Sequence, residues 1–455
     1  MNFCTNLISG LIALFKIFAF ANFNEQSISI IKNLLLEGNL LSAEQCIKQI
    51  TIGLESEIMR LVLNKLCQGK HVETAMKTAA KAQGLRQFVR QKTTLRLSNG
   101  RVITLKSWYA QKAPDGYTGS RDLFHAFFQT VHKSSPLHTS NVSSTSVICP
   151  SFDVAADIMT ELGVPTTSDW HRDVSASFAQ KCVGKHAELV LKNGETLAGK
   201  TVLIAIDGGR CRTREPNGTF SDKNNRTYEK YDTPWIEPKL FVISTIDENG
   251  QTNKLDLPIF DAAFGMDEMF ELLRTYLVRL NIDQADIVQV TADGALWIWN
   301  RVTPFLIDLG VPKNRIVETL DYYHAHEHLT KLIAYLPENK QADNRLLFKK
   351  LLWDGDIAAI KTQLQSIFPD LDTNPLKPFD YFEKNAIRMN YKYCKKNNLV
   401  RGSGIIESGI RRVLNLRFKC PSAFWKPENV EPLIFLRGAF LSKRWDYLQN
   451  NFYKN

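Results

Sequence analysis

Hydrophobic positions in the first part of the chain recur every three or four residues. Between residues 25 and 88, stretches such as IKNLLLEG and LESEIMRLVLNKL have this spacing, which predicts amphipathic helices. The period changes in TTLRLSNGRVITLK, where Leu95 and Leu97 alternate with polar residues up to Asn99-Gly100 and an extended pattern follows. Because Asn-Gly between two extended runs is a strong turn signal, a β-hairpin is predicted here.

The next hundred residues predict a connection, a helical pair and then strands. Residues 134–148, SSPLHTSNVSSTSVI, are rich in Ser and Thr and predict a connection. FDVAADIMTELGVPTTSDWHRDVSASFAQ predicts two helices around Gly163-Val164-Pro165, with Thr167 or Ser168 capping the second. This is the outline of a helix-turn-helix, although an ordinary helical pair has the same outline.

From about residue 187 the pattern changes to that of an α/β protein. The strand-like runs LVLKNG, TVLIAID, KLFVISTIDENG and KLDLPIF precede the helical run MDEMFELLRTYLVRL, and the strand-like runs IVQVTAD and RIVETLD follow it. This order suits a ribonuclease-H-like mixed sheet flanked by helices. The expected domains are a helical region (1–88), a basic hairpin and linker (89–150), a helix-turn-helix-like DNA-binding segment (151–185), a catalytic core (186–336), a helical insertion (337–400) and C-terminal core helices (401–455).

Charge and cysteine usage narrow the class of protein. The 57 Lys and Arg against 47 Asp and Glu give a net charge of +10, which favours polyanionic partners. The stretch from Thr74 to Pro114 holds nine basic residues and no acidic one, so the predicted hairpin could lie on a DNA backbone or simply be a solvated basic face. The eight cysteines include no Cys-x-x-Cys pair, which argues against a zinc ribbon and favours buried thiols in a reducing cytoplasm.

The N-terminus carries a strongly apolar stretch, LISGLIALFKIFAFA, at residues 7–21. No basic residue precedes it and Lys16 interrupts it, which disfavours a secretory signal. The stretch is also shorter than the roughly 20 residues of a membrane span. A buried or partner-facing helix is the favoured interpretation, with no membrane association.

Three acidic residues are candidates for catalysis. Asp207 ends TVLIAID and precedes two glycines, and Asp293 ends IVQVTAD and precedes Gly294, although an Asp-Gly pair after a strand is also an ordinary turn. Glu407 lies in RGSGIIESGIRR, where a glutamate in the first helical turn is also favoured by the helix dipole. Phosphodiester chemistry needs charge stabilisation on the entering and leaving oxygens, which two Mg²⁺ ions about 4 Å apart supply when carboxylates hold them.

Spacing alone does not select these three acids, but their surroundings resemble a known family. TADGALWIWN, RIVETLDYYHAHEHL, RGSGIIESGIRR and FLRGAFLSKRWDYL resemble, in this order, the transposases of the ISKra group of bacterial insertion sequences, which belong to the Asp–Asp–Glu superfamily. The resemblance extends from about residue 85 to the end and is strongest from the Asp207 strand onward. It implies that Asp207, Asp293 and Glu407 are the catalytic and metal-binding residues, with two Mg²⁺ ions, or Mn²⁺ in their place, per site.

The same resemblance implies roles for other residues and partners. Asp321 and His324 match an Asp-x-x-His motif beside the active site of related transposases, with His324 in a hydrogen-bonding role. His324 and His328 also share one helical face, a spacing that suits a zinc pair, while His326 points elsewhere. The partners implied are double-stranded DNA, as transposon ends and target, and further copies of the chain in a synaptic complex. One departure is that SWYAQKAPDG lacks the Cys-rich turn that many relatives carry after the hairpin.

Basic residues near the acids are candidate phosphate contacts. Arg210, Arg212 and Arg214 extend from Asp207 with one residue between each, which suits DNA binding if the segment is extended, and a solvated basic loop is the alternative. Arg411 and Arg412 follow Glu407. Three other functions fit less well: a related nuclease or resolvase that cleaves without joining, a transposase-derived DNA-binding protein with a dead site, and a hydrolase of small phosphate esters.

Overall fold

The computed structural model describes residues 25–112, 121–252, 258–368, 377–421 and 423–454. The chain forms two compact units, one of residues 1–145 and 152–177 and the other of residues 146–151 and 178–455. The apolar stretch at residues 7–21 lies outside the described residues, as does most of the KLDLPIF run. The finer division into six domains stays a prediction. In the described residues, no helix has the length and apolar character needed to cross a membrane.

The first unit confirms the helices and the hairpin that its sequence predicts. Leu95 pairs with Ile103 across the hairpin, and Gly100 at its tip has a φ of +82°, a conformation that glycine adopts without strain. Leu95, Leu97, Ile103 and Leu105 form a buried cluster against which Leu63 packs. The elements are α2 (Glu25–Leu36), α3 (Leu40–Cys67), α4 (Lys70–Ala82), β1 (Arg86–Arg96), β2 (Val102–Lys112), β3 (Arg121–Asp122) and α5 (Leu123–Phe127).

Two local predictions are wrong. Residues 134–148 are not a connection, because Pro136–Ile148 form helix α6, whose polar side chains, including His138, Thr139 and Ser143, are buried. LVLKNG is not a strand, because most of its apolar residues belong to the short helix α9 (His186–Val190). In both segments tertiary burial outweighs the local composition. The predicted helical pair is confirmed as α7 (Phe152–Glu161) and α8 (Ser168–Cys182), and the Thr167 hydroxyl caps α8 by accepting from the Trp170 amide at 3.2 Å.

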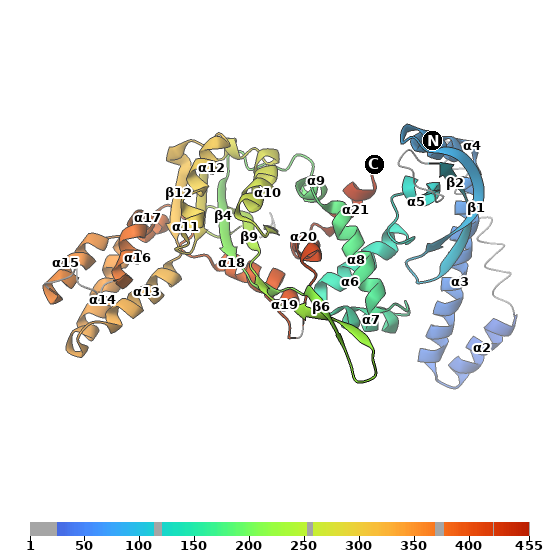
Figure 1. Ribbon diagram of the computed structural model, residues 1–455, viewed down its shortest axis with the longest axis horizontal. Helices are drawn as coiled ribbons and strands as arrows, with labels where there is room; N and C mark the ends of the chain where they lie inside the picture. The colour runs from blue at the N-terminus through green and yellow to red at the C-terminus, as the bar shows by residue number, and fades with distance from the viewer. Residues whose placement is uncertain (1–24, 113–120, 253–257, 369–376, 422, 455) are drawn as a thin grey trace. The chain divides into compact units, whose positions relative to one another are not determined.

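The second unit is built on a mixed five-stranded sheet with the order β10-β9-β4-β11-β12 (Figure 1). Strands β4, β11 and β12 are parallel neighbours, whereas β9 is antiparallel to both β4 and β10. The strands are buried runs of apolar residues, as expected for a sheet covered on both faces. They are β4 (Thr201–Gly208), β9 (Lys239–Ile246), β10 (Ile259–Ala263), β11 (Ile287–Ala292) and β12 (Ile316–Leu320).

Helices cover the two faces of this sheet. Tyr276 of α10 (Met266–Arg279) contacts Phe241 and Asp261 on one face. Gly409 of α18 (Gly404–Gly409) lies against Phe260, which points to the opposite face because adjacent strand residues alternate. The expected mixed sheet flanked by helices is therefore confirmed. Further helices after β11 include α11 (Leu296–Trp299), α12 (Val302–Asp308), α13 (Tyr322–Ala334), α19 (Leu416–Phe418), α20 (Pro427–Leu441) and α21 (Trp445–Tyr453).

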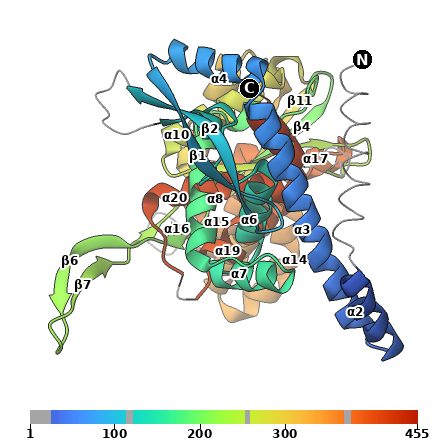
Figure 2. The ribbon, with the colours of Figure 1, turned by 90° about the vertical axis from the view of Figure 1, so that its right-hand side faces the viewer.

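Two segments leave the sheet. A hairpin of β6 (Glu215–Ser221) and β7 (Thr227–Asp232), which the hydrophobic pattern did not predict, extends away from the sheet, and none of its strand residues is buried (Figure 2). It leaves the sheet between the short paired strands β5 (Cys211–Arg212) and β8 (Trp235–Ile236). The described residues of the predicted insertion, 337–368 and 377–400, are largely helical, with α14 (Glu338–Asp354), α15 (Ile357–Ile367), α16 (Lys377–Asn385) and α17 (Tyr391–Lys396).

Candidate functional site

The sheet brings three aspartates to one edge. Asp207 is the penultimate residue of β4, Asp293 follows the last residue of β11, and Asp321 follows the last residue of β12. Because these three strands are parallel neighbours, their carboxyl ends lie together, and the Asp321 amide donates to the Ala292 carbonyl oxygen at 2.9 Å. Such an edge, where strands end and loops begin, is the usual place for a binding site in an open α/β sheet.

Asp321 is fully buried and joins two segments. Its carboxylate caps helix α13 by accepting from the His324 amide at 2.7 Å, and it also accepts from the Ser403 amide just before α18. Burial alone would raise the pKa of Asp321, but the hydrogen bonds from His324 and Ser403 outweigh it and lower the pKa to about 2. Asp321 is therefore ionised and holds α13 and the segment before Glu407 together.

His324 faces this carboxylate. Its Nδ1 lies 3.4 Å from Asp321 Oδ1, and hydrogen bonding to Asp321 raises the pKa of His324 to about 9 despite partial burial. At neutral pH the ring is therefore a cation. In the absence of metal the ring is thus paired with Asp321, which suits the predicted hydrogen-bonding role, and His324 also belongs to the group of side chains that could hold a metal ion. His328, the other member of the expected zinc pair, instead stacks on Tyr381 with ring centroids 3.7 Å apart.

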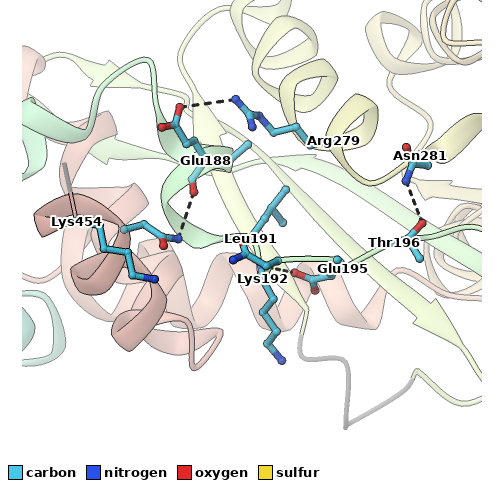
Figure 3. Close-up of a pocket in the computed structure, with 12 residues that line it drawn as sticks. Glu188, Leu191, Lys192, Glu195, Thr196, Arg279, Asn281 and Lys454 are labelled. Atoms are coloured by element: carbon cyan, nitrogen blue, oxygen red, sulfur yellow. Dashed lines mark hydrogen bonds and ion pairs between the residues drawn. The ribbon is translucent and has the colours of Figure 1, made fainter. Parts of the chain in front are cut away.

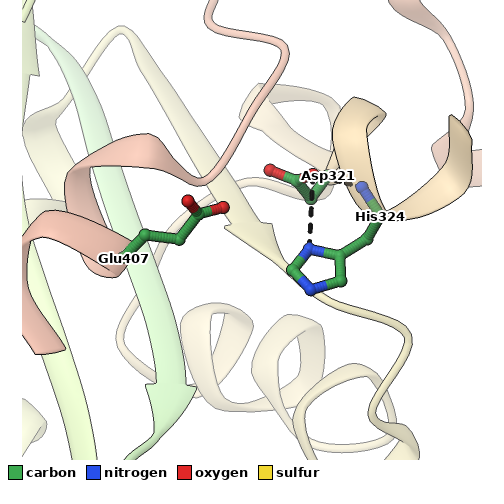
Figure 4. Close-up of side chains that lie close together, drawn as sticks. All are labelled: Asp321, His324 and Glu407. Atoms are coloured by element: carbon green, nitrogen blue, oxygen red, sulfur yellow. Dashed lines mark hydrogen bonds and ion pairs between the residues drawn. The ribbon is translucent and has the colours of Figure 1, made fainter. Parts of the chain in front are cut away.

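Glu407 reaches the same place from helix α18. One ligand atom from each of Asp321, His324 and Glu407 lies within 4.8 Å of the others (Figure 4). Ser403 Oγ donates to Glu407 Oε1 at 3.3 Å, which orients the glutamate toward the aspartate. The helix continues as a π-helix, Ile410–Asn415, and such insertions are frequent at functional sites.

Glycines allow α18 to approach the end of β4. A Cβ on Gly209 would collide with Leu414 of the π-helix and would lie 3.6 Å from Ile410. Gly209 therefore permits close approach of the π-helix, whereas a Cβ on Gly208 would meet the side chain of Glu237. This approach brings Asp207 and Glu407 to one cleft of about 650 Å³, lined by Asp207, Gly208, Tyr323, His324, Glu327, Glu407 and Ile410.

Asp207 and Asp293 are close enough to influence each other. Burial, the charge of Asp293 and the charge of Glu237 raise the pKa of Asp207 to about 6, against the opposing effects of the Gly208 amide and His324. Asp293 Oδ1 accepts from the Ala295 amide at 2.9 Å, and its carbonyl oxygen accepts from Trp299 Nε1 at 2.6 Å. Trp299 thus packs behind the strand end, while Trp297 is half-buried with Lys239 above its ring.

The structure therefore places every predicted acid at one sheet edge but does not cluster them as expected. Among the described residues, the compact set is Asp321, His324 and Glu407, whereas Asp207 and Asp293 lie around it. Carboxylate oxygens are the ligands that hard divalent cations prefer, although Asp207 and Asp293 are only partly buried and Glu407 is exposed. Asp207, Asp293 and Glu407 are the residues that could hold such ions, and Asp321 is committed to two backbone amides.

The arginines near the site divide into exposed and buried ones. Cys211 and Thr213 are buried while the arginines on either side of them are exposed, so the segment is extended and presents Arg210, Arg212 and Arg214 on one surface. Arg212 and Arg214 also lie over aromatic rings, at 5.0 Å from Trp235 and 4.5 Å from Tyr231. Beyond Glu407, Arg411 is exposed, Arg412 lies over the Phe260 ring, and the buried Arg417 donates to the carbonyl oxygens of Ser146 and Pro150.

A second cavity of about 550 Å³ lies near the opposite end of β4, where the strand begins (Figure 3). Its charged groups are of both signs: Glu188 lies 3.7 Å from Arg279, and Glu195 pairs with the buried Arg444. Asn281 donates to Thr196 at 3.3 Å. This mixed, internally paired lining contrasts with the acid-rich cleft at the other end of the strand.

Two residues of the site were not predicted. Ser403 contributes its amide to Asp321 and its hydroxyl to Glu407, and it lies within the RGSGIIESG motif, which was the available signal. Tyr381 arrives from the helical insertion and gave no signal in the sequence. No protein-family model matches the chain, and no curated protein matches it significantly.

Proposed function

We propose that the protein is a metal-dependent DNA transposase of the Asp–Asp–Glu type, in which Asp207, Asp293 and Glu407 hold two Mg²⁺ or Mn²⁺ ions. The observation that carries the proposal is the meeting of Asp207 and Glu407, 200 residues apart in sequence, with His324 in one cleft at the carboxyl edge of the parallel strands. Motifs that resemble one transposase group supply the residues that line this edge.

The topology supports a ribonuclease-H-like core. Numbered by their order in the chain, the five strands lie in the order 3-2-1-4-5, with the second strand antiparallel to the first. Such a mixed sheet, flanked by helices, suits a ribonuclease-H-like core. Asp207 lies at the end of the first strand, Asp293 directly after the fourth, and Glu407 in a helix beyond the fifth.

The residues around the acids would each have a role in catalysis or DNA binding. Bound divalent cations would activate the attacking water or 3′-hydroxyl and stabilise charge on the leaving oxygen. Asp321 holds Ser403 and His324 in place, and Ser403 in turn directs Glu407 into the cleft. Protonated His324 offers a positive charge to a phosphate group at the cleft. Arg210, Arg212 and Arg214 would contact the DNA backbone on the exposed surface beside Asp207.

The test uses a supercoiled plasmid that carries candidate element ends, incubated with the full chain and Mg²⁺ or Mn²⁺. Inverted repeats in the DNA that flanks the reading frame would supply these ends. Cleavage at the ends followed by joined products is the expected result. Cleavage without joining would favour the nuclease or resolvase alternative, and DNA binding without any cleavage would favour a transposase-derived binding protein.

DNA binding itself has a separate signature. If the three arginines bind phosphates, replacing Arg210, Arg212 and Arg214 together by Gln makes the dependence of log K on log salt less steep, by about 0.9 for each phosphate that the protein no longer neutralises. An unchanged slope would show that this surface does not meet the DNA backbone.

A further inference from the structure

The helical insertion places one aromatic side chain against the loop that carries Asp293. Tyr381 lies on α16, and a Cβ added to Gly294 would be 2.5 Å from Tyr381 Cε2. The ring therefore occupies the space that any side chain at position 294 would need. Gly294, which the sequence predicts to be a turn residue, thus also provides the surface against which the Tyr381 ring packs.

A second contact fixes the orientation of the ring. The face of Tyr381 stacks on the imidazole of His328 in α13, with centroids 3.7 Å apart and an interplanar angle of 9°. Phe382 packs edge-on against the same ring at 5.5 Å. With its ring held by the Gly294 loop, α13 and its own helix, Tyr381 has a defined direction for its hydroxyl.

That hydroxyl is the unusual part of the arrangement. It is buried and has no hydrogen-bond partner among the residues that the structure describes. Burial and the negative charges of Asp293, Asp321 and Glu327 raise the pKa of Tyr381, so the phenol stays neutral and remains a donor. A buried donor without a partner lowers stability, so packing alone would be served as well by phenylalanine.

We propose that Tyr381 is a positioning residue for Asp293, to which its hydroxyl donates a hydrogen bond when the site binds divalent metal. The inference rests on the proposed function. Asp293 Oδ1 already accepts from the Ala295 amide, and groups that hydrogen-bond to metal-binding carboxylates orient them and strengthen metal affinity. Tyr381 would thereby couple the insertion, which starts beyond residue 336, to the catalytic edge of the sheet.

Tyr381→Phe tests this by removing one oxygen and keeping the ring on Gly294 and His328. Tyr393→Phe is the matched control, because Tyr393 lies in the same insertion but is 45% exposed. Mn²⁺ is titrated calorimetrically into each full-length protein without DNA. Tyr381→Phe is expected to bind Mn²⁺ roughly 10- to 100-fold more weakly, and Tyr393→Phe to bind it as the wild type does.

Thermal unfolding without metal separates positioning from folding. The metal-free Tyr381→Phe protein is expected to unfold at the same temperature as wild type or a higher one, because the hydroxyl that it lacks has no partner. Equal Mn²⁺ affinity in wild type and Tyr381→Phe would overturn the inference and leave the proposed function standing. A lower unfolding temperature together with weaker affinity would assign the hydroxyl to the fold and also overturn it. Wild-type protein that binds no Mn²⁺ would overturn the proposed function itself.

Discussion

Asp321→Asn tests whether the buried carboxylate holds the site together. The substitution keeps the size of the side chain but removes its charge and turns one hydrogen-bond acceptor into a donor. The His324 amide donates to one carboxylate oxygen and the Ser403 amide to the other, so the side-chain NH₂ group of asparagine would face one of these amide donors without an acceptor between them.

The magnitude follows from the pKa of Asp321. Lowering it from an ordinary value of 3.8 to about 2 corresponds to about 2.4 kcal/mol of stability at neutral pH. Because the folded-state pKa is the lower one, this contribution is complete above pH 3.8 and is lost as the pH falls toward 2. Asp321→Asn should therefore lower the free energy of unfolding by at least about 2 kcal/mol at pH 7, with a smaller difference near pH 3.

The assay is urea unfolding of the full chain, followed through the transition of the second unit. Asp356→Asn is the matched control, since Asp356 also caps a helix, by accepting from the Ala359 amide at 2.9 Å, but is exposed. Asparagine caps helices about as well as aspartate, so this variant should change stability by less than about 0.5 kcal/mol. Equal effects of the two substitutions at pH 7 would refute the reasoning.

Two further predictions concern acid stability and close packing. Burial lowers the pKa of both His138 and His171 to about 4. The stability that these neutral histidines contribute to the first unit is therefore fully present above pH 6.5 and falls by up to about 3 kcal/mol per histidine as the pH approaches 4. An unfolding midpoint that does not change between pH 6.5 and pH 4 would contradict this prediction. Gly209→Ala introduces a Cβ that collides with Leu414, so it should destabilise the second unit by about 1–3 kcal/mol and reduce DNA cleavage. Gly53→Ala, at an exposed position of α3 where nothing lies within 4 Å, is the control and should not destabilise the chain. Chemical unfolding and the plasmid assay compare the two variants, and wild-type behaviour of Gly209→Ala would contradict the close approach of the π-helix.

Turn residues and apolar runs predicted much of the fold, because turns and strands depend mainly on residues that are close together in the sequence. Asn99-Gly100 predicted the first hairpin, and the apolar runs before Asp207 and Asp293 predicted strands that the structure confirms. Local signals failed where distant parts of the chain decide the outcome. Residues 134–148 have the composition of a connection yet form a helix with buried polar side chains.

The hairpin β6–β7 was missed for the opposite reason. Its residues are polar and exposed, so no hydrophobic alternation marks them, and the chain pairs with itself without a covering layer. A sequence pattern reports which side chains are buried, and here almost none are.

The sequence pointed to the acids at the ends of strands but not to Ser403, Tyr381 or the geometry of the cleft. The acids at strand ends could be found because parallel strands share a carboxyl edge, and Glu407 could be found by its motif. The contact of Tyr381 with Gly294 joins residues 87 positions apart and depends on how the insertion packs, which no periodicity reports. The hydrogen bonds of Asp321 with the His324 and Ser403 amides likewise appear only in three dimensions.

Asp293→Ala gives the most direct test of the central claim that this edge of the sheet cuts DNA. The Asp293→Ala protein is expected to keep its unfolding temperature without metal and its affinity for element-end DNA, but to lose cleavage of the supercoiled plasmid in Mg²⁺ and in Mn²⁺. Cleavage at the wild-type rate by the folded Asp293→Ala protein would contradict the account.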